Sequence, residues 1–303
     1  MSAEGGGPTR SRAATEERSG RRRDRSRPPA PEPLPYQVVD NHCHLDIADA
    51  QEGSEWLDVD SALAAATAVG VPRIVQIGCD LPSARAAVTT AETHAAIVAG
   101  VALHPNEAPR LADAGRLSKA LAEIERLATS SHRVRAVGET GMDFFRTGEE
   151  GRAAQEESFR AHIRLAHRLD KTLVIHNREA HTDVLRVLDE EGAPPRTVMH
   201  CFSGDSVFAR ECLDRGAFLS FAGTVTFATA ETLREALRVT PPDRVLVETD
   251  APYLTPVPYR GRPNASYLLP YTVRCIAQVR DTDLDRVCRE IDAATAEAYG
   301  GRW

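Results

Sequence analysis

The feature that most limits how this chain can fold is a regular alternation of short apolar segments with longer amphipathic ones, which begins after Tyr36. Alternation of this kind predicts repeated βαβ units and a parallel sheet that is buried on both faces. Eight segments have the length and composition of such strands. They are residues 38–40, 73–77, 97–101, 135–137, 172–175, 197–199, 217–220 and 244–247. Eight parallel strands with a helix after each form a (β/α)₈ TIM barrel, so we predict this α/β fold.

The segments between the predicted strands have the spacing and the ends of helices. Phe159, Ile163 and Ala166 share one face of the helix after the fourth strand. Asp205 is expected to cap a later helix, which Gly216 ends. The alternative fold, an open doubly wound sheet, normally carries a Gly-rich turn after its first strand, and the sequence has none there. The barrel is therefore favoured.

The first 35 residues differ in composition from the rest of the chain. They are rich in Gly, Ser, Pro and Arg, and they contain almost no large apolar residue that could anchor them to a core. We therefore expect a disordered tail at residues 1–35 and a single barrel domain at residues 36–303, so a chain beginning near Tyr36 should keep its stability. The arginine run of the tail could touch nucleic acid, although such a run is usually only solvated. It consists of Arg21, Arg22, Arg23, Arg25 and Arg27.

Composition argues against several classes of protein. No run of about 18 apolar residues could span a membrane, and the N-terminus lacks the apolar stretch of a secretory signal, so we expect a cytoplasmic protein without membrane contact. The six cysteines include no Cys-x-x-Cys pair, which argues against a zinc ribbon. A net charge of -7 argues against a broad nucleic-acid-binding face, although a local site with divalent ions could attract phosphate. Nothing in the sequence requires an obligate protein partner or more than a monomer.

Polar residues follow most of the predicted strands. In a (β/α)₈ barrel the C-terminal strand ends meet at one mouth, where the active site is built. The residues that follow the first, third, fourth, fifth, sixth and eighth strands are His42 with His44, His104, Glu139, His176, His200, and Glu248 with Asp250. These side chains are therefore expected to converge.

Histidines and carboxylates at converging strand ends indicate a metal centre. His42 and His44 are two residues apart, so on an extended strand both rings point to the same side and can bind one ion. Together with the histidines and carboxylates of other strands they make more ligands than the three that a catalytic zinc ion takes. Two ions that share a carboxylate would suit the set, and they would activate a bridging water for hydrolysis, first of all of a phosphodiester. The remaining histidines fall in helical or linking segments and are expected to be structural or exposed; they are His94, His132, His162, His167 and His181.

Seven motifs between residues 38 and 299 resemble, in the same order, those of the TatD family of metal-dependent deoxyribonucleases. The motifs are DNHCHLD at 40–46, ALHPNE at 102–107, GETGMDFF at 138–145, VIHNRE at 174–179, MHCFSG at 199–204, ETDAPYL at 248–254 and RGRPNASYL at 260–268. Departures are small. Leu103 stands where a small residue often precedes His-Pro, and Ala294-Thr295 stands where the family has Asn-Thr.

The resemblance implies roles for individual residues. It implies that the metal ligands are His42, His44, Glu139, His176, His200 and Asp250. Glu139 matches the carboxylate that bridges the ions, and Glu139 and Asp250 are the expected catalytic residues. The resemblance also implies that His104, Arg178 and Asn264 contact the substrate. For Arg178, a structural ion pair is the competing interpretation.

Three functions remain open at this stage. The resemblance implies 3′–5′ exonuclease-type cleavage of single-stranded DNA or oligonucleotide ends. The same ligand set could serve a two-metal ester or amide hydrolase, such as an aminoacyl-tRNA deacylase. A non-catalytic binding barrel would require the loss of a ligand, and all six are present. The two divalent ions could be Mg, Mn or Zn, because histidine ligands suit zinc or manganese whereas phosphoryl chemistry often uses magnesium.

Overall fold

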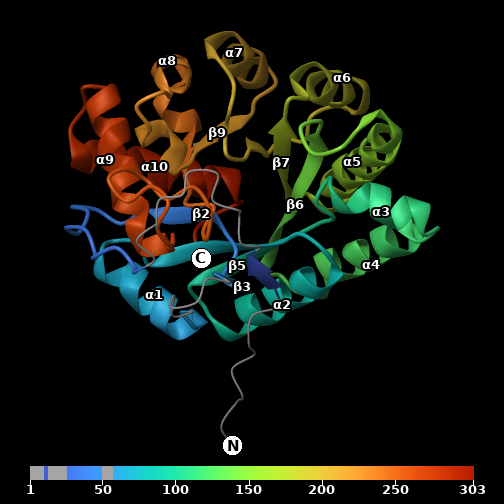
Figure 1. Cartoon of the computed structure of the whole chain (residues 1–303), viewed down its shortest axis with the longest axis horizontal. Helices are drawn as coiled ribbons and strands as arrows, with labels where there is room; N and C mark the ends of the chain where they lie inside the picture. The colour runs from blue at the N-terminus through green and yellow to red at the C-terminus, as the bar shows by residue number, and fades with distance from the viewer. Residues whose placement is uncertain (1–9, 13–25, 50–56) are drawn as a thin grey trace, which may run out of the picture.

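The computed structural model describes residues 10–12, 26–49 and 57–303, and its main feature is a parallel sheet that curls into a nearly closed barrel inside a ring of helices (Figure 1). The sheet has eight strands, in the order β10-β9-β8-β7-β6-β5-β4-β2. Their bounds are β2 (Val39–Cys43), β4 (Arg73–Gly78), β5 (Ile97–Val101), β6 (Val134–Asp143), β7 (Thr172–Arg178), β8 (Thr197–Met199), β9 (Phe218–Phe221) and β10 (Val245–Val247). The predicted TIM barrel and its eight strands are confirmed.

Helices surround the barrel: α1 to α8 connect successive strands, and α9 and α10 follow the last one. They are α1 (Val59–Ala68), α2 (Leu81–Thr93), α3 (Glu107–Asp113), α4 (Leu117–Ser130), α5 (Glu149–Leu169), α6 (His181–Glu191), α7 (Ser206–Asp214), α8 (Glu231–Val239), α9 (Leu269–Val279) and α10 (Leu284–Ala298). Asp205 caps α7 as predicted, since its carboxylate accepts hydrogen bonds from the backbone N–H groups of Val207 and Phe208. A separate two-stranded parallel sheet pairs β1 (Arg10–Arg12) with β3 (Ile47–Asp49). Among the described residues, no helix is both long and apolar enough to cross a membrane.

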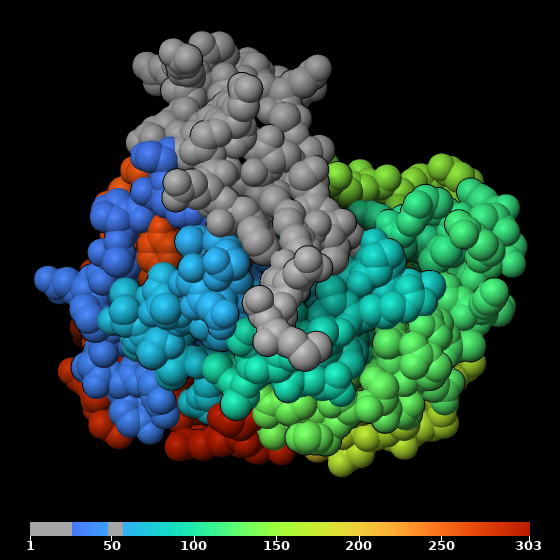
Figure 2. Space-filling view, turned by 90° about the horizontal axis from the view of Figure 1, so that it is seen from below, coloured from blue at the N-terminus to red at the C-terminus, as the bar shows by residue number. Residues whose placement is uncertain are grey.

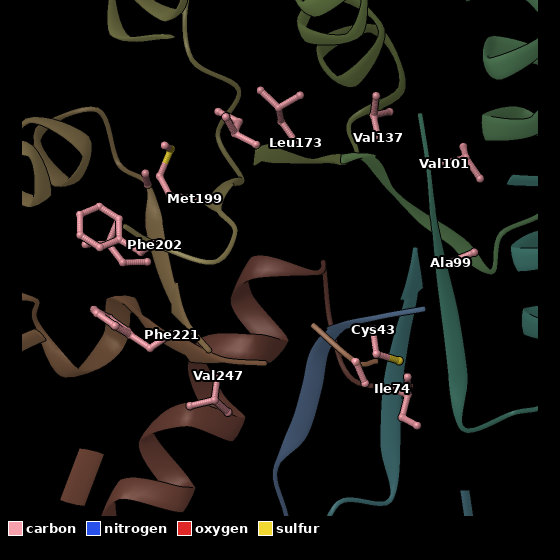
Figure 3. Close-up of a cluster of buried hydrophobic side chains, with 14 of the residues drawn as sticks. Cys43, Ile74, Ala99, Val101, Val137, Leu173, Met199, Phe202, Phe221 and Val247 are labelled. Atoms are coloured by element: carbon pink, nitrogen blue, oxygen red, sulfur yellow. The ribbon is translucent and has the colours of Figure 1, made fainter. Parts of the chain in front are cut away.

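The core has two parts because successive strand residues point to opposite faces of the sheet. Side chains such as Ile74, Leu173 and Val247 belong to the cluster between the sheet and the helices (Figure 3). Their neighbours Val75 and Val174 belong to the smaller cluster inside the barrel. Each strand is therefore anchored on both faces, which holds its C-terminal end in a defined place.

The first and last strands meet just beyond β10, at the mouth of the barrel. The Asp250 N–H donates to the His42 carbonyl at 2.9 Å, and the His44 N–H donates to the Ala251 carbonyl at 2.8 Å. Asp40, which is fully buried, accepts a hydrogen bond from the Thr249 N–H at 2.9 Å. Barrel closure thus places the His42–His44 segment directly beside Asp250.

Residues 26–35 differ from the predicted disordered tail, most of which lies outside the described residues. Leu34 is buried in the outer core cluster, and the Tyr267 hydroxyl donates to the Pro28 carbonyl at 2.6 Å. Arg262 donates to the Arg27 carbonyl, and Arg274 donates to the carbonyls of residues 32 and 33. Figure 2 shows the blue segment along the surface beside α1. Composition missed this contact because the segment binds mainly through backbone carbonyls, which every residue carries.

The contacts of residues 26–35 lead to a prediction about stability. A chain that begins at Tyr36 should be less stable than one that begins at Ser26, because it loses the burial of Leu34 and the hydrogen bonds to Arg262, Tyr267 and Arg274. Losses of this kind amount to about 3 kcal/mol, or roughly 5 °C or more in Tm. Both chains lack residues 1–25, so the difference in Tm by circular dichroism reports on residues 26–35 alone. Equal Tm values would mean that the segment adds nothing to stability.

Candidate metal centre

The six predicted ligands lie together at the mouth of the barrel. His42 lies in β2 and His44 follows that strand, Glu139 and His176 lie in β6 and β7, and His200 and Asp250 follow β8 and β10. The His42 and His44 Nε2 atoms are 3.3 Å apart, and the His42 ring stacks on that of His200 with 3.6 Å between centroids. The structure therefore brings these residues together from five strands.

The carboxylate of Glu139 lies between two pairs of histidines. Its Oε1 is 3.8 Å from Nε2 of both His42 and His44. Its Oε2 is 3.2 Å from His176 Nδ1 and 3.2 Å from His200 Nε2. Asp250 joins the first pair only, with Oδ1 at 3.4 Å from His44 Nε2 and 3.9 Å from His42 Nε2. One carboxylate thus offers a separate oxygen to each histidine pair.

Glycine allows β6 and β7 to approach at this point. Gly141 has a φ of 140°, and a Cβ there would lie only 2.0 Å from the His176 carbonyl oxygen. The register between β6 and β7 shifts between Val137 and Thr140, across the position of Glu139. This irregular section carries few apolar residues, which is why the predicted strand, residues 135–137, is shorter than β6.

Electrostatics at the mouth suit a bound cation. Burial alone would raise the pKa of Glu139, but His200, His104 and His176 hold it well below its usual range, so the carboxylate stays ionised. Burial, together with the charge of His200, lowers the pKa of His42 well below its usual value, which keeps that imidazole neutral. A neutral imidazole and an ionised carboxylate are the forms that bind metal.

Each of three histidines has a second partner that orients its ring. His44 Nδ1 donates to the Ile77 carbonyl at 3.0 Å, which leaves Nε2, on the side of His42, as the atom that would bind an ion when the ring is neutral. His200 Nδ1 lies 2.8 Å from Glu248 Oε1, and His176 Nε2 lies 3.3 Å from Asp143 Oδ2. Such outer partners are typical of metal-binding histidines, and the donor set as a whole fits divalent cations.

Asp143 was not among the predicted site residues, and Glu248 was expected at the mouth but was given no role. Glu248 follows the eighth strand, two residues before Asp250, and Asp143 is four residues after Glu139. Their position near strand ends was a usable signal. Their partners could not be inferred, because each pairs with a histidine from another strand: Asp143 with His176 of the adjacent β7, and Glu248 with His200, which follows β8.

His104 lies beside the six residues but is oriented as a hydrogen-bond donor. Its Nδ1 accepts from the Asn106 N–H at 3.1 Å, so its Nε2 carries the proton and faces Glu139 Oε1 at 4.0 Å. Burial lowers the pKa of His104 to about 3, which keeps the ring neutral. A protonated Nε2 is not available to bind metal, which agrees with a place in the substrate pocket.

Arg178 and Asn264 have different surroundings. The Arg178 guanidinium carbon lies 3.9 Å from the ring centroid of Phe145, which is 57% exposed, and no hydrogen bond or ion pair within the described residues engages this guanidinium. Asn264 is buried, and its amide donates to the carbonyls of Thr249 and Tyr253 while its oxygen accepts from the Ala265 N–H. Arg178 is therefore available to a substrate, whereas Asn264 stabilises the loop that carries Asp250.

His162 is a satisfied core histidine, as predicted. Its Nδ1 donates to the Ser158 carbonyl at 2.6 Å, and its Nε2 accepts from the Leu103 N–H at 3.2 Å. This buried ring supports the backbone directly before His104. Thr295 matches the second residue of the family's Asn-Thr pair, and its hydroxyl accepts from the amide of Asn41, which precedes His42, at 3.1 Å.

Comparisons with known proteins agree with this arrangement. The family model described as TatD related DNase matches residues 39–300. A relative from Mycobacterium tuberculosis (strain ATCC 25618 / H37Rv), named an uncharacterized metal-dependent hydrolase TatD, is 46% identical over 270 residues, or 88% of this chain and 99% of the relative. The metal-dependent hydrolase YcfH of Escherichia coli (strain K12), also named uncharacterized, is 38% identical over 242 residues, which are 80% of this chain and 86% of that relative. The crystal structure of YJJV, a TatD homolog from Escherichia coli K12, has the same fold, with a TM-score of 0.77 at 24% identity over 88% of this chain and 98% of that one.

Proposed function

Because this chain belongs to the TatD-related family of metal-dependent hydrolases, we propose that it hydrolyses phosphodiester bonds of single-stranded DNA from the 3′ end with two divalent ions. The observation that carries the proposal is the position of Glu139, whose two oxygens face different histidine pairs. One carboxylate that bridges two ions is typical of two-metal hydrolysis.

The two ligand groups follow from the distances. His42, His44, Asp250 and Oε1 of Glu139 would hold one ion, and His176, His200 and Oε2 of Glu139 would hold the other. Bound there, the ions would supply an activated water and neutralise charge on the phosphate that is cleaved. Histidine ligands suit zinc or manganese, and magnesium remains a third candidate.

Other residues of the mouth would bind and orient the substrate. His104 would donate its Nε2 proton to a phosphate oxygen, since this donor already points at the carboxylate between the ligand groups. Asp250, whose side chain is 14% exposed, would accept a proton from the attacking water. The chain thereby provides a donor for the phosphate and an acceptor for the proton.

Arg178 and Phe145 favour a substrate with phosphates and bases over a small ester or amide. The guanidinium of Arg178 can bind a phosphate with two hydrogen bonds. The exposed ring of Phe145 offers a face or an edge to a nucleobase, and stacking of this kind is how single strands are bound without sequence preference. A hydrolase of small esters or amides would need neither group, whereas an aminoacyl-tRNA has both phosphates and bases, so the assay of cleavage products decides between DNA and that ester.

The polarity of cleavage tests the proposal. Single-stranded DNA labelled at its 5′ end should be shortened stepwise in the presence of Mn²⁺, Mg²⁺ or Zn²⁺, and gel electrophoresis should show a ladder. Circular single strands should resist, because they have no end. The release of radioactivity from a 3′-labelled strand should be the earliest event.

Other outcomes would replace the proposal. Rapid cutting of circles would indicate an endonuclease. Turnover of an aminoacyl ester without any release of nucleotide would instead identify the ester hydrolase.

A further inference from the structure

At the mouth, one barrel strand is followed directly by a residue that the predicted site does not include. β4 ends at Gly78, and Cys79, which is 6% exposed, follows directly. The backbone of Cys79 is fixed on both sides, because its N–H donates to Ser83 Oγ at 2.9 Å and its carbonyl accepts from the His104 N–H at 2.8 Å. Glycine is needed before it, since a Cβ on Gly78 would lie 2.4 Å from the Ala84 Cα. The thiol is therefore held at a defined point of the mouth.

The Cys79 thiol lies between two of the proposed ligands. Its Sγ is 3.2 Å from Glu139 Oε1, which is within the range of a hydrogen bond from a thiol. It is also 3.8 Å from His44 Nδ1, which already donates to the Ile77 carbonyl. An ionised carboxylate only accepts hydrogen bonds, so Cys79 donates its S–H to Oε1.

This hydrogen bond restricts the rotation of the Glu139 carboxylate. The terminal torsion of a glutamate is broad, so the carboxylate plane turns easily unless neighbours fix it. His176 and His200, both 3.2 Å from Oε2, hold one end of the carboxylate, and the thiol holds Oε1 at the other end, on the side of His42 and His44. Because a carboxylate oxygen has more than one acceptor site and S–H is a weak donor, Oε1 can still bind an ion.

We propose that Cys79 is a positioning residue for Glu139, which orients the carboxylate so that each oxygen serves one ion. This inference rests on the two-ion site of the proposed function. It also gives a role to the end of β4, which supplies none of the six proposed ligands.

Metal affinity tests the proposal directly. Isothermal titration of the metal-free full chain with Mn²⁺ should show binding that is about 10- to 100-fold weaker in Cys79→Ala and Cys79→Val, which is the usual loss when an outer partner of a metal ligand is removed. Cys79→Val fills the space of the thiol, so it separates the lost donor from a cavity. Cys79→Ser keeps a donor and should stay near the parental affinity. Cys212→Ala removes another buried thiol, in α7, and should bind Mn²⁺ like the parent.

The possible outcomes separate this inference from the proposed function. Parental Mn²⁺ affinity in Cys79→Ala and Cys79→Val would overturn the role of Cys79, and so would equally weak binding by the serine and valine variants. If circular dichroism shows that the alanine variant does not fold, the comparison of serine with valine decides. A parental chain that binds two ions and releases no nucleotide would remove the exonuclease assignment and leave the role of Cys79 standing.

Discussion

Replacing Glu139 by glutamine should lower the rate of hydrolysis by well over a hundredfold. Loss of an outer partner of a metal ligand costs at most about a hundredfold, and loss of the bridging ligand itself should cost more. Glutamine keeps the shape of the side chain but removes its charge and one of its two acceptor oxygens. The Oε1 and Oε2 atoms of Glu139 face different histidine pairs, so both ions should bind more weakly. The barrel should remain folded, because its core lies below the mouth.

The matched control is His104→Ala. His104 lies at the same mouth, but its protonated Nε2 makes it a donor and not a ligand. This variant should lose turnover while its metal content stays near that of the parent. Elemental analysis of both purified variants, with circular dichroism to confirm folding, separates the two roles. If Glu139→Gln kept both ions and near-parental activity, another residue would have to bridge them, and Asp250 would be the first candidate.

Replacing Asp250 by asparagine should remove one ion in preference to the other. Asp250 approaches only the His42–His44 pair, with Oδ1 at 3.4 Å from His44 Nε2. The loss of its charge should weaken the ion at that pair, while the ion at His176 and His200 remains. The rate should fall by about a hundredfold or more, because the proposed proton acceptor is lost together with an ion.

His176→Gln is the counterpart of this variant, since His176 contacts the other oxygen of Glu139. Titration with Mn²⁺ should show one strong site in each variant, and the double variant should show neither. Equal weakening of both ions in Asp250→Asn would contradict the division of ligands between the two histidine pairs.

Much of the fold could be predicted from the sequence, because the periodicity of strands and helices is a local property of the chain. Buried strands and amphipathic helices impose their own periodicity, so all eight strands were found. His42 and His44 could be paired because residues two apart share one side of a strand. The order of the strands then predicted that ligands far apart in the chain would meet.

The features that could not be predicted from the sequence depend on contacts between segments that are distant in the chain. Cys79 reaches Glu139 from another strand, and residues 26–35 bind through carbonyls that carry no sequence signal. The amide of Asn264, predicted to contact substrate, donates to two carbonyls of its own loop, which only the three-dimensional arrangement reveals.

The most direct test of a two-ion site is the rate of DNA hydrolysis by the metal-free chain as Mn²⁺ is added back in measured equivalents. Two ions should bind per chain, and most of the activity should appear with the second, because each oxygen of Glu139 would serve a different ion. Full activity at one bound ion per chain, with no further change on adding a second, would contradict a two-ion mechanism.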